Sequence, residues 1–150
     1  MKKEQTYETD VAQASCELEI EAVIENLPQV TGFVESRLEA AGCALKAKMQ
    51  IGVAVEEIFV NIAHYAYAPK TGKATVRVDI SHAPDQVWIT FLDHGIPYNP
   101  LEKSDPDVTL PVSQREIGGL GIFMTKKLMD DVCYAYRDGQ NILKLKKICE

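Results

Sequence analysis

Two segments in which apolar and polar residues alternate, separated by a short turn, limit the fold of this chain more than any other feature. Residues 74–80 (ATVRVDI) and 86–92 (QVWITFL) place apolar side chains at every second position. Such alternation is typical of strands that bury one face of a sheet. Residues 83–85 (APD) between them suit a turn. The middle of the chain is therefore predicted to form a hairpin, and we expect its single tryptophan, Trp88, to lie in the core.

The segments on either side of this hairpin follow strand or helix patterns. We expect a strand at 15–23, helices at 27–41, 45–67 and 118–130, and short closing strands at 132–136 and 142–146. This order predicts an α/β sandwich of the α+β class, with helices layered on one face of a mixed, mostly antiparallel sheet. The 150 residues have the length of one domain, which we place at 1–150 with a flexible segment at 1–12.

Charge and cysteine content disfavour several classes of protein. The formal net charge is −6, whereas nucleic acids and anionic lipids attract a clustered basic face. The four cysteines form no C-x-x-C pair, which favours reduced thiols in a reducing compartment. Near its start the sequence lacks the apolar run of a signal peptide. We therefore expect a cytoplasmic protein that binds neither nucleic acid nor membrane directly.

The long helix predicted at 45–67 carries the first candidate site. Its apolar residues form two rows, Met49, Val53, Val60 and Tyr67 on one side and Ile51, Val55, Ile58 and Ile62 on the other. A helix of this kind is expected to be buried between two layers. Glu57 and Asn61 share the polar seam between the rows, four residues apart. Buried polar groups need partners or a purpose, so this pair is either a functional site or a solvated edge with a local contact.

The loop at 93–117 carries the second candidate site. It is rich in Pro, Asp and Ser, and loops longer than about 12–15 residues tend to be lids or binding loops. It opens directly after a strand with Asp93, whose carboxylate can accept a hydrogen bond from an exocyclic amino group such as that of adenine. Gly95 would let the backbone approach a ligand closely. The alternative is an ordinary turn, because these residue types are common in turns.

The glycine-rich segment Gly118-Gly119-Leu120-Gly121 stands at the start of the last predicted helix. Glycines there expose backbone N–H groups at the positive end of the helix dipole, which suits a chain of phosphates. The alternative is a flexible hinge. Arg115 in the preceding loop is the better electrostatic candidate for phosphate, and the lysines at 126 and 127 are interpreted as solvated surface.

Taken together, these three motifs resemble those of the GHKL (Bergerat-fold) ATPase superfamily, and within it the RsbW-like anti-sigma factors that are serine-protein kinases. VEEIFVNIAHYAY is similar to the family's N box, DHGIPYNP to its first glycine box and GGLGIFMTKKLMD to its second. The resemblance extends over the chain from the first strand to the last. It implies a Bergerat-type ATP-binding fold with ATP and Mg²⁺ as cofactors.

The resemblance also implies a role for each matching residue. Asn61 would be a magnesium ligand, and Glu57 the general base for a substrate serine. Asp93 would receive the adenine amino group, with Gly95 leaving room for the base. The ATP lid would span 101–117. The phosphate-binding and lid-associated positions implied are Pro97, Arg115, Gly118, Gly119, Leu120 and Gly121.

The sequence departs from the family pattern at several positions. Pro97 occupies the place of the second glycine in the family's D-x-G-x-G motif, although the Pro-Tyr-Asn-Pro ending is typical of the RsbW-like branch. Asn141-Ile142 stands where the family often carries Thr-Thr against the adenine site. We expect this change to weaken one hydrogen bond, and Asn141 is left out of the predicted site. Residues 65–67 (YAY) replace the common His-Gly-Tyr.

The resemblance implies a protein kinase that phosphorylates a serine of an anti-sigma-factor antagonist, sequesters a sigma factor and forms a homodimer. An alternative is a nucleotide-gated partner-switch module that binds ATP with little or no kinase activity. The catalytic half of a histidine kinase is disfavoured, because the chain has no pair of upstream dimerisation helices with a phospho-acceptor histidine.

Overall fold

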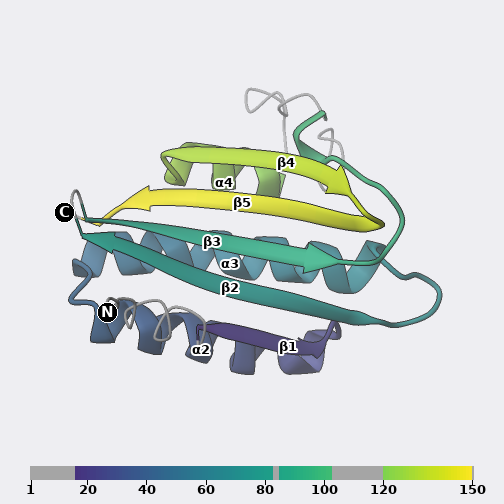
Figure 1. Ribbon diagram of the computed structural model, residues 1–150, viewed down its shortest axis with the longest axis horizontal. Helices are drawn as coiled ribbons and strands as arrows, with labels where there is room; N and C mark the ends of the chain where they lie inside the picture. Colours follow the sequence, from purple (N-terminus) through teal and green to yellow (C-terminus); the bar gives the residue numbers. More distant parts are fainter. Residues whose placement is uncertain (1–15, 83–84, 103–119, 150) are drawn as a thin grey trace, which may run out of the picture.

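The protein folds around a five-stranded antiparallel sheet (Figure 1). The computed structural model describes residues 16–82, 85–102 and 120–149. The order across the sheet is β1-β2-β3-β5-β4. Its strands are β1 (Glu17–Glu21), β2 (Lys73–His82), β3 (Asp85–Asp93), β4 (Asp131–Arg137) and β5 (Gln140–Ile148). All four pairings between neighbours are antiparallel, so the predicted mixed sheet has no parallel pair among the described strands.

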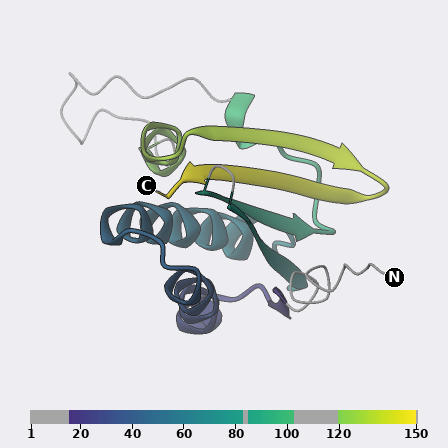
Figure 2. The same cartoon turned by 60° about the vertical axis from the view of Figure 1, so that its left-hand side comes forward.

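The helices are layered on one face of this sheet, and Figures 1 and 2 show them together on the same side. They are η1 (Ile24–Asn26), α2 (Leu27–Ala40), α3 (Leu45–Tyr65), η2 (Pro100–Glu102) and α4 (Leu120–Leu128). The predicted α+β fold class is confirmed. None of the helices in the described ranges combines the length and the apolar character that a membrane crossing requires. The segment at 1–12 that was predicted to be flexible lies outside the described residues.

The central hairpin forms as its alternation predicts. Val76 and Val78 of β2, with Val87, Ile89 and Phe91 of β3, are all at most 1% exposed and face the helices. The expectation for Trp88 is wrong, because it alternates with these residues and therefore lies on the face of the sheet opposite the helices. There it is half-buried between Lys144 and Lys146 of β5, whose ammonium groups lie 5.1 and 5.5 Å from its ring.

Helix α3 is buried on one side only. Ile51, Val55 and Ile58 pack against the sheet, whereas Met49 and Val53 are 64% and 45% exposed. The prediction that both apolar rows are buried is therefore wrong. The sheet covers one side of α3, and α2 and α4 pack along its flanks. The row that contains Met49 and Val53 faces away from the sheet and remains accessible.

The hairpin and the closing strands bring two distant residues together at one end of the sheet. Asp93, the last residue of β3, is the register partner of Asn141 in β5. Both side chains point to the helix-covered face, because they continue the alternation of Phe91 and Leu143. The C-terminal half of α3 passes over this end of the sheet, as the lining of a shared cavity shows.

Candidate functional site

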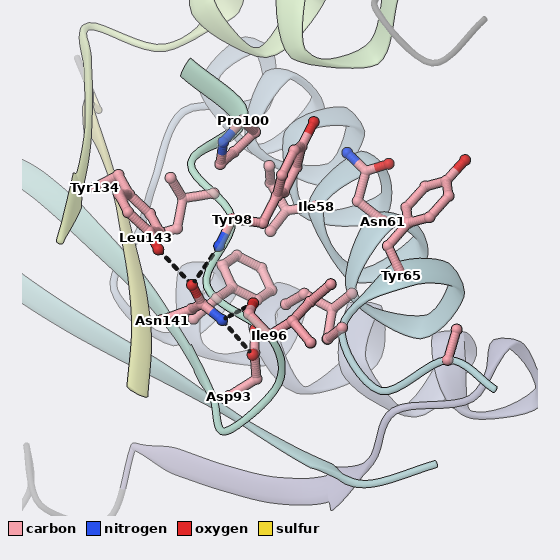
Figure 3. A pocket seen from close by; sticks show the side chains of 14 residues that line it. Ile58, Asn61, Tyr65, Asp93, Ile96, Tyr98, Pro100, Tyr134, Asn141 and Leu143 are labelled. Carbon is pink, nitrogen blue, oxygen red and sulfur yellow. Dashed lines mark hydrogen bonds between the residues drawn. The ribbon is translucent and has the colours of Figure 1, made fainter. Parts of the chain in front are cut away.

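A cavity of about 460 Å³ lies between the C-terminal half of α3 and the ends of β3, β4 and β5 (Figure 3). Its walls are mostly apolar, and a few polar groups converge on it. Ile58, Asn61, Ile62, Tyr65, Ala66 and Ala68 come from α3 and the turn after it, Ile96, Tyr98 and Pro100 from the loop after β3, and Phe91, Asp93, Tyr134, Asn141 and Leu143 from the sheet. An apolar slot with a few fixed polar groups is the usual form of a small-molecule site.

Asp93 supplies the carboxylate at the sheet side of this cavity. It is only 6% exposed. Its Oδ1 atom accepts hydrogen bonds from the backbone N–H of Gly95 and from Nδ2 of Asn141, both at 2.9 Å. Among the residues that the structure describes, neither group donates to Oδ2. One oxygen of a nearly buried carboxylate is thus committed to the protein, and the other is available to a ligand.

Asn141 is the site residue that the sequence prediction missed. Its Nδ2 group donates to Asp93, to the carbonyl of Ile96 at 2.8 Å and more weakly to the carbonyl of Gly95 at 3.5 Å. Its Oδ1 atom accepts from the N–H of Tyr98 at 3.1 Å and from the hydroxyl of Tyr134, as Figure 3 shows. All of these hydrogen bonds are made within the protein, and the expectation of a weakened bond to adenine stays a prediction. No local sequence pattern reveals this role, because Asn141 in β5 meets Asp93 in β3 only in the assembled sheet.

The hydroxyl of Tyr134 is held in its protonated form at this site. Burial raises its pKa, the N–H of Tyr98 lowers it, and the nearby negative charge of Asp93 raises it further. A protonated hydroxyl can donate to Oδ1 of Asn141. The charge on Asp93 therefore favours the donor state of the tyrosine that orients its own partner.

Gly95 lies where the loop after β3 meets the end of α3. The N–H of Ile96 donates to the carbonyl of Ala66 at 2.9 Å, and a Cβ atom on Gly95 would overlap that carbonyl. The hydroxyl of Tyr67 adds a second tie, accepting from the N–H of His94 at 2.7 Å and donating to the carbonyl of Lys73 at 2.6 Å. Glycine is therefore required here by a contact within the protein.

Asn61 and Glu57 lie on the helix side, one turn apart on α3. Asn61 is half-buried and lines the cavity, across from Asp93 and Asn141 in Figure 3. Glu57 is also half-buried but does not line the cavity. Its carboxylate lies against Gly121 in the first turn of α4. The structure thus joins Asn61 to Asp93 through one cavity and Glu57 to the start of α4.

The other predicted positions fall at or beyond the edge of this cavity. Pro97 is exposed and is not part of the lining. Leu120 is the first residue of α4. Arg115, Gly118 and Gly119 lie outside the described residues, as does the predicted lid at 101–117 except for its first two positions in η2. Within the described ranges, no three His, Cys, Asp or Glu side chains gather in a way that could hold a metal ion.

Similarity to proteins of known family agrees with this geometry. Residues 20–147 match the histidine kinase-like ATPase domain family. Over 100 residues the chain is 29% identical to the serine-protein kinase RsbW of Bacillus mycoides strain KBAB4 and 30% identical to that of Bacillus cereus strain B4264. Each alignment covers 64% of this chain and 61% of the relative, so the chain spans about three fifths of the relatives' length.

Two solved structures share the fold. The RsbU and RsbW domains of Rv1364c from Mycobacterium tuberculosis align with a TM-score of 0.61 at 17% identity, covering 88% of this chain and 32% of that one. The SiaB–SiaC complex from Pseudomonas aeruginosa aligns with a TM-score of 0.57 at 12% identity, covering 99% of both chains. The resemblance drawn from the three sequence motifs is confirmed.

Proposed function

Because the chain belongs to the histidine kinase-like ATPase domain family, we propose that it binds Mg-ATP in this cavity and transfers the γ-phosphate to a serine of a partner protein. The observation that carries the nucleotide assignment is Asp93, a nearly buried carboxylate with one oxygen open to an apolar cavity. The kinase assignment is supported by the relatives, which bear the name serine-protein kinase RsbW.

The adenine base is assigned to the inner part of the cavity. Ile58 and Ile62 of α3 face Phe91 and Leu143 of the sheet across it, and apolar walls suit the two faces of a purine. The open oxygen of Asp93 would accept from the exocyclic amino group. Burial strengthens this charge-assisted hydrogen bond, because little water competes for the carboxylate.

Asn61 is assigned to magnesium. Mg²⁺ is usually held by one or two protein oxygens, with waters and phosphate oxygens as its other ligands. The amide oxygen of Asn61, which is half-buried and lines the cavity, matches this mode of coordination. When bound, the ion supplies neutralisation of phosphate charge. We assign 101–117 to the lid and Arg115, Gly118, Gly119, Leu120 and Gly121 to the phosphates, as the sequence motifs imply.

Glu57 is assigned the role of general base. In the proposed transfer, the serine hydroxyl oxygen forms a bond to the γ-phosphorus while the bond to the β-phosphate oxygen breaks. The serine proton passes to the Glu57 carboxylate, and ADP leaves. Glu57 lies one turn from Asn61 on α3 and beside the first turn of α4, which keeps it close to the residues assigned to the metal and the phosphates.

A partner-switch module with little kinase activity is the second candidate. The observation in its favour is that Glu57 contacts Gly121 and does not line the cavity. Under this alternative, ATP binding controls which protein partner is held and no phosphate is transferred. The two candidates differ in what Glu57 contributes, so a substitution there separates them.

The proposed partners are an anti-sigma-factor antagonist as the serine substrate and a sigma factor as the sequestered protein. The resemblance to the RsbW-like anti-sigma factors supports both, and the name serine-protein kinase RsbW of the relatives agrees with a serine substrate. We also propose that the protein is cytoplasmic and forms a homodimer, in which each chain is one ATP-binding domain over 1–150. Leu45, Met49 and Val53 on the outer side of α3 are 69%, 64% and 45% exposed and offer an apolar surface for such contacts.

Thermal unfolding with and without ATP and magnesium tests the nucleotide assignment. A site filled at about 100 times its dissociation constant stabilises the folded state by roughly 2.7 kcal/mol. The native chain should show a magnesium-dependent rise in the unfolding midpoint that Asp93→Asn loses. Asp131→Asn is the matched control, since Asp131 is exposed at the start of β4. No rise in the native chain at millimolar nucleotide would reject the proposed function.

A further inference from the structure

The amide of Asn141 can take only one orientation in this site. Its Nδ2 group faces the Asp93 carboxylate and the carbonyls of Ile96 and Gly95, which are all acceptors. Its Oδ1 atom faces the N–H of Tyr98 and the hydroxyl of Tyr134, which are both donors. The reverse orientation would set an oxygen against three acceptors and an NH₂ group against the N–H of Tyr98, which can only donate. Asn141 is therefore locked by its surroundings and is 8% exposed.

Among the residues that the structure describes, this arrangement leaves Oδ2 of Asp93 as an unused acceptor at the sheet side of the cavity. Both hydrogens of the Asn141 amide have acceptors in the protein, and its oxygen has two donors. Asn141 therefore has no hydrogen-bonding group left for a ligand. Oδ1 of Asp93 already accepts two hydrogen bonds. Oδ2 of Asp93 remains as the acceptor available to a ligand.

Adenine and guanine differ in the hydrogen-bond donors that they present to a carboxylate such as that of Asp93. Adenine carries one exocyclic amino donor beside a ring nitrogen that accepts, whereas guanine carries two adjacent donors, the ring N1–H and the amino group. A carboxylate with two open oxygens can bind both guanine donors in parallel, in the way it binds the fork of an arginine. A carboxylate with one open oxygen matches adenine and leaves one guanine donor unpaired, which is unfavourable in a buried site.

We propose that Asn141 is a positioning residue that makes this site selective for adenine over guanine nucleotides, by occupying one oxygen of Asp93. The proposal rests on the proposed binding of ATP. Asn141 acts through Asp93 and the loop after β3, not by direct contact with the base. It also ties the carbonyl of Ile96, whose N–H is held by Ala66 at 2.9 Å, so both backbone groups of this cavity-lining residue are fixed.

The test compares the dissociation constants of ATP and GTP, both with magnesium, for the native chain and two variants. The side chains introduced in the two variants have the same shape as each other. Asn141→Thr keeps a hydroxyl that can donate to Asp93, whereas Asn141→Val lacks it. The native chain should prefer ATP by roughly a hundredfold, because one buried guanine donor is left unpaired. Asn141→Val should lower that preference by about tenfold, the effect of one hydrogen bond to a charged group. Asn141→Thr should retain most of it.

The dissociation constants of ATP and GTP distinguish a failure of the proposed function from a failure of the role proposed for Asn141. A native chain that binds neither nucleotide rejects the proposed function itself. A native chain that binds ATP and GTP equally, or an Asn141→Val variant that binds ATP with the native preference, overturns the role of Asn141 and leaves ATP binding intact. If Asn141→Val does not fold, Tyr134→Phe is the substitute variant. It removes the hydroxyl that donates to Oδ1 of Asn141, and it should lower the preference for ATP over GTP by a smaller factor. An unchanged ratio in that variant counts equally against the proposal.

Discussion

The carboxylate of Glu57 in α3 lies so close to Gly121 in α4 that a methyl group on the glycine would overlap its Oε1 atom. Helices α3 and α4 are in extensive contact. At this point of the interface, the side chain of Glu57 meets the backbone of Gly121. The absence of a Cβ at position 121 therefore determines where the carboxylate can lie. The sequence prediction treated these residues as parts of two separate motifs.

Gly121→Ala should reduce the rate of phosphoryl transfer by a larger factor than it reduces the affinity for ATP. The added methyl displaces Glu57, the proposed base, and a general base contributes about 10²- to 10⁴-fold to the rate. Transfer would be measured from γ-labelled ATP to protein serine in an extract of the source cells. Gly32→Ala in α2 is the matched control, since a Cβ there meets nothing within 4 Å. That variant should gain up to about 1 kcal/mol of stability and transfer normally. Full activity in Gly121→Ala would contradict the placement of Glu57.

Glu57→Ala should distinguish the kinase from the partner-switch module. If the protein is a kinase, Glu57→Ala should bind ATP like the native chain, and its rate of phosphoryl transfer should fall by about 10²-fold or more. The measurement pairs an ATP titration with the labelled-phosphate assay. Glu56→Ala is the control, because this neighbouring carboxylate is exposed. No transfer in the native chain with its partner present would favour the module. Unchanged transfer in Glu57→Ala would instead reject Glu57 as the general base.

Asn61→Ala should remove most of the magnesium dependence of ATP binding. The variant loses the one amide oxygen that α3 offers to the cavity, so chelating the metal should change its ATP affinity far less than that of the native chain. The check is the ratio of ATP dissociation constants with and without magnesium. His64→Ala, at an exposed position one turn later, should leave the ratio unchanged. A native ratio in Asn61→Ala would reassign the metal ligand.

Alkaline pH should destabilise the fold partly through Cys149. Burial first, and then its contact with Cys43, raise the pKa of the Cys149 thiol from 9.0 to about 12. The unfolded chain therefore loses this proton near pH 9.0 while the folded chain keeps it, so stability is lost as pH rises from 9.0 towards 12. In reductant, the unfolding free energy should fall less between about pH 8 and pH 10 in Cys149→Ala. Cys133→Ala, at an exposed position, should behave like the native chain; equal slopes in all three would disprove the effect.

Local patterns predicted the fold because each element carries its own signal. The hairpin follows from alternation, and the observed helix α3 begins at the predicted residue and ends two residues before the predicted end. The error about α3 has a physical origin. A helical pattern shows which residues share a side, but only the packing of the layers decides whether that side is covered, and Met49 and Val53 face no layer.

The candidate site was predicted in part for a related reason. Asp93 and Asn61 belong to motifs that can be recognised along the chain, whereas the contribution of Asn141 depends on partners from two other segments, Asp93 and Ile96 from the loop region and Tyr134 from β4. Compared with the family pattern, Asn141 in place of a threonine looked like the loss of a hydroxyl. In the fold it brings an amide, which has one more donor and a separate acceptor.

The position of Trp88 has a practical consequence for optical measurements. It is the only tryptophan in the chain, and it lies between Lys144 and Lys146 on the face of the sheet opposite the helices, whereas the cavity lies on the helix-covered face. Its fluorescence emission should therefore respond to loss of the sheet and hardly at all to occupancy of the cavity. The native protein thus carries an intrinsic fluorophore that reports unfolding independently of the signal used to follow ligand.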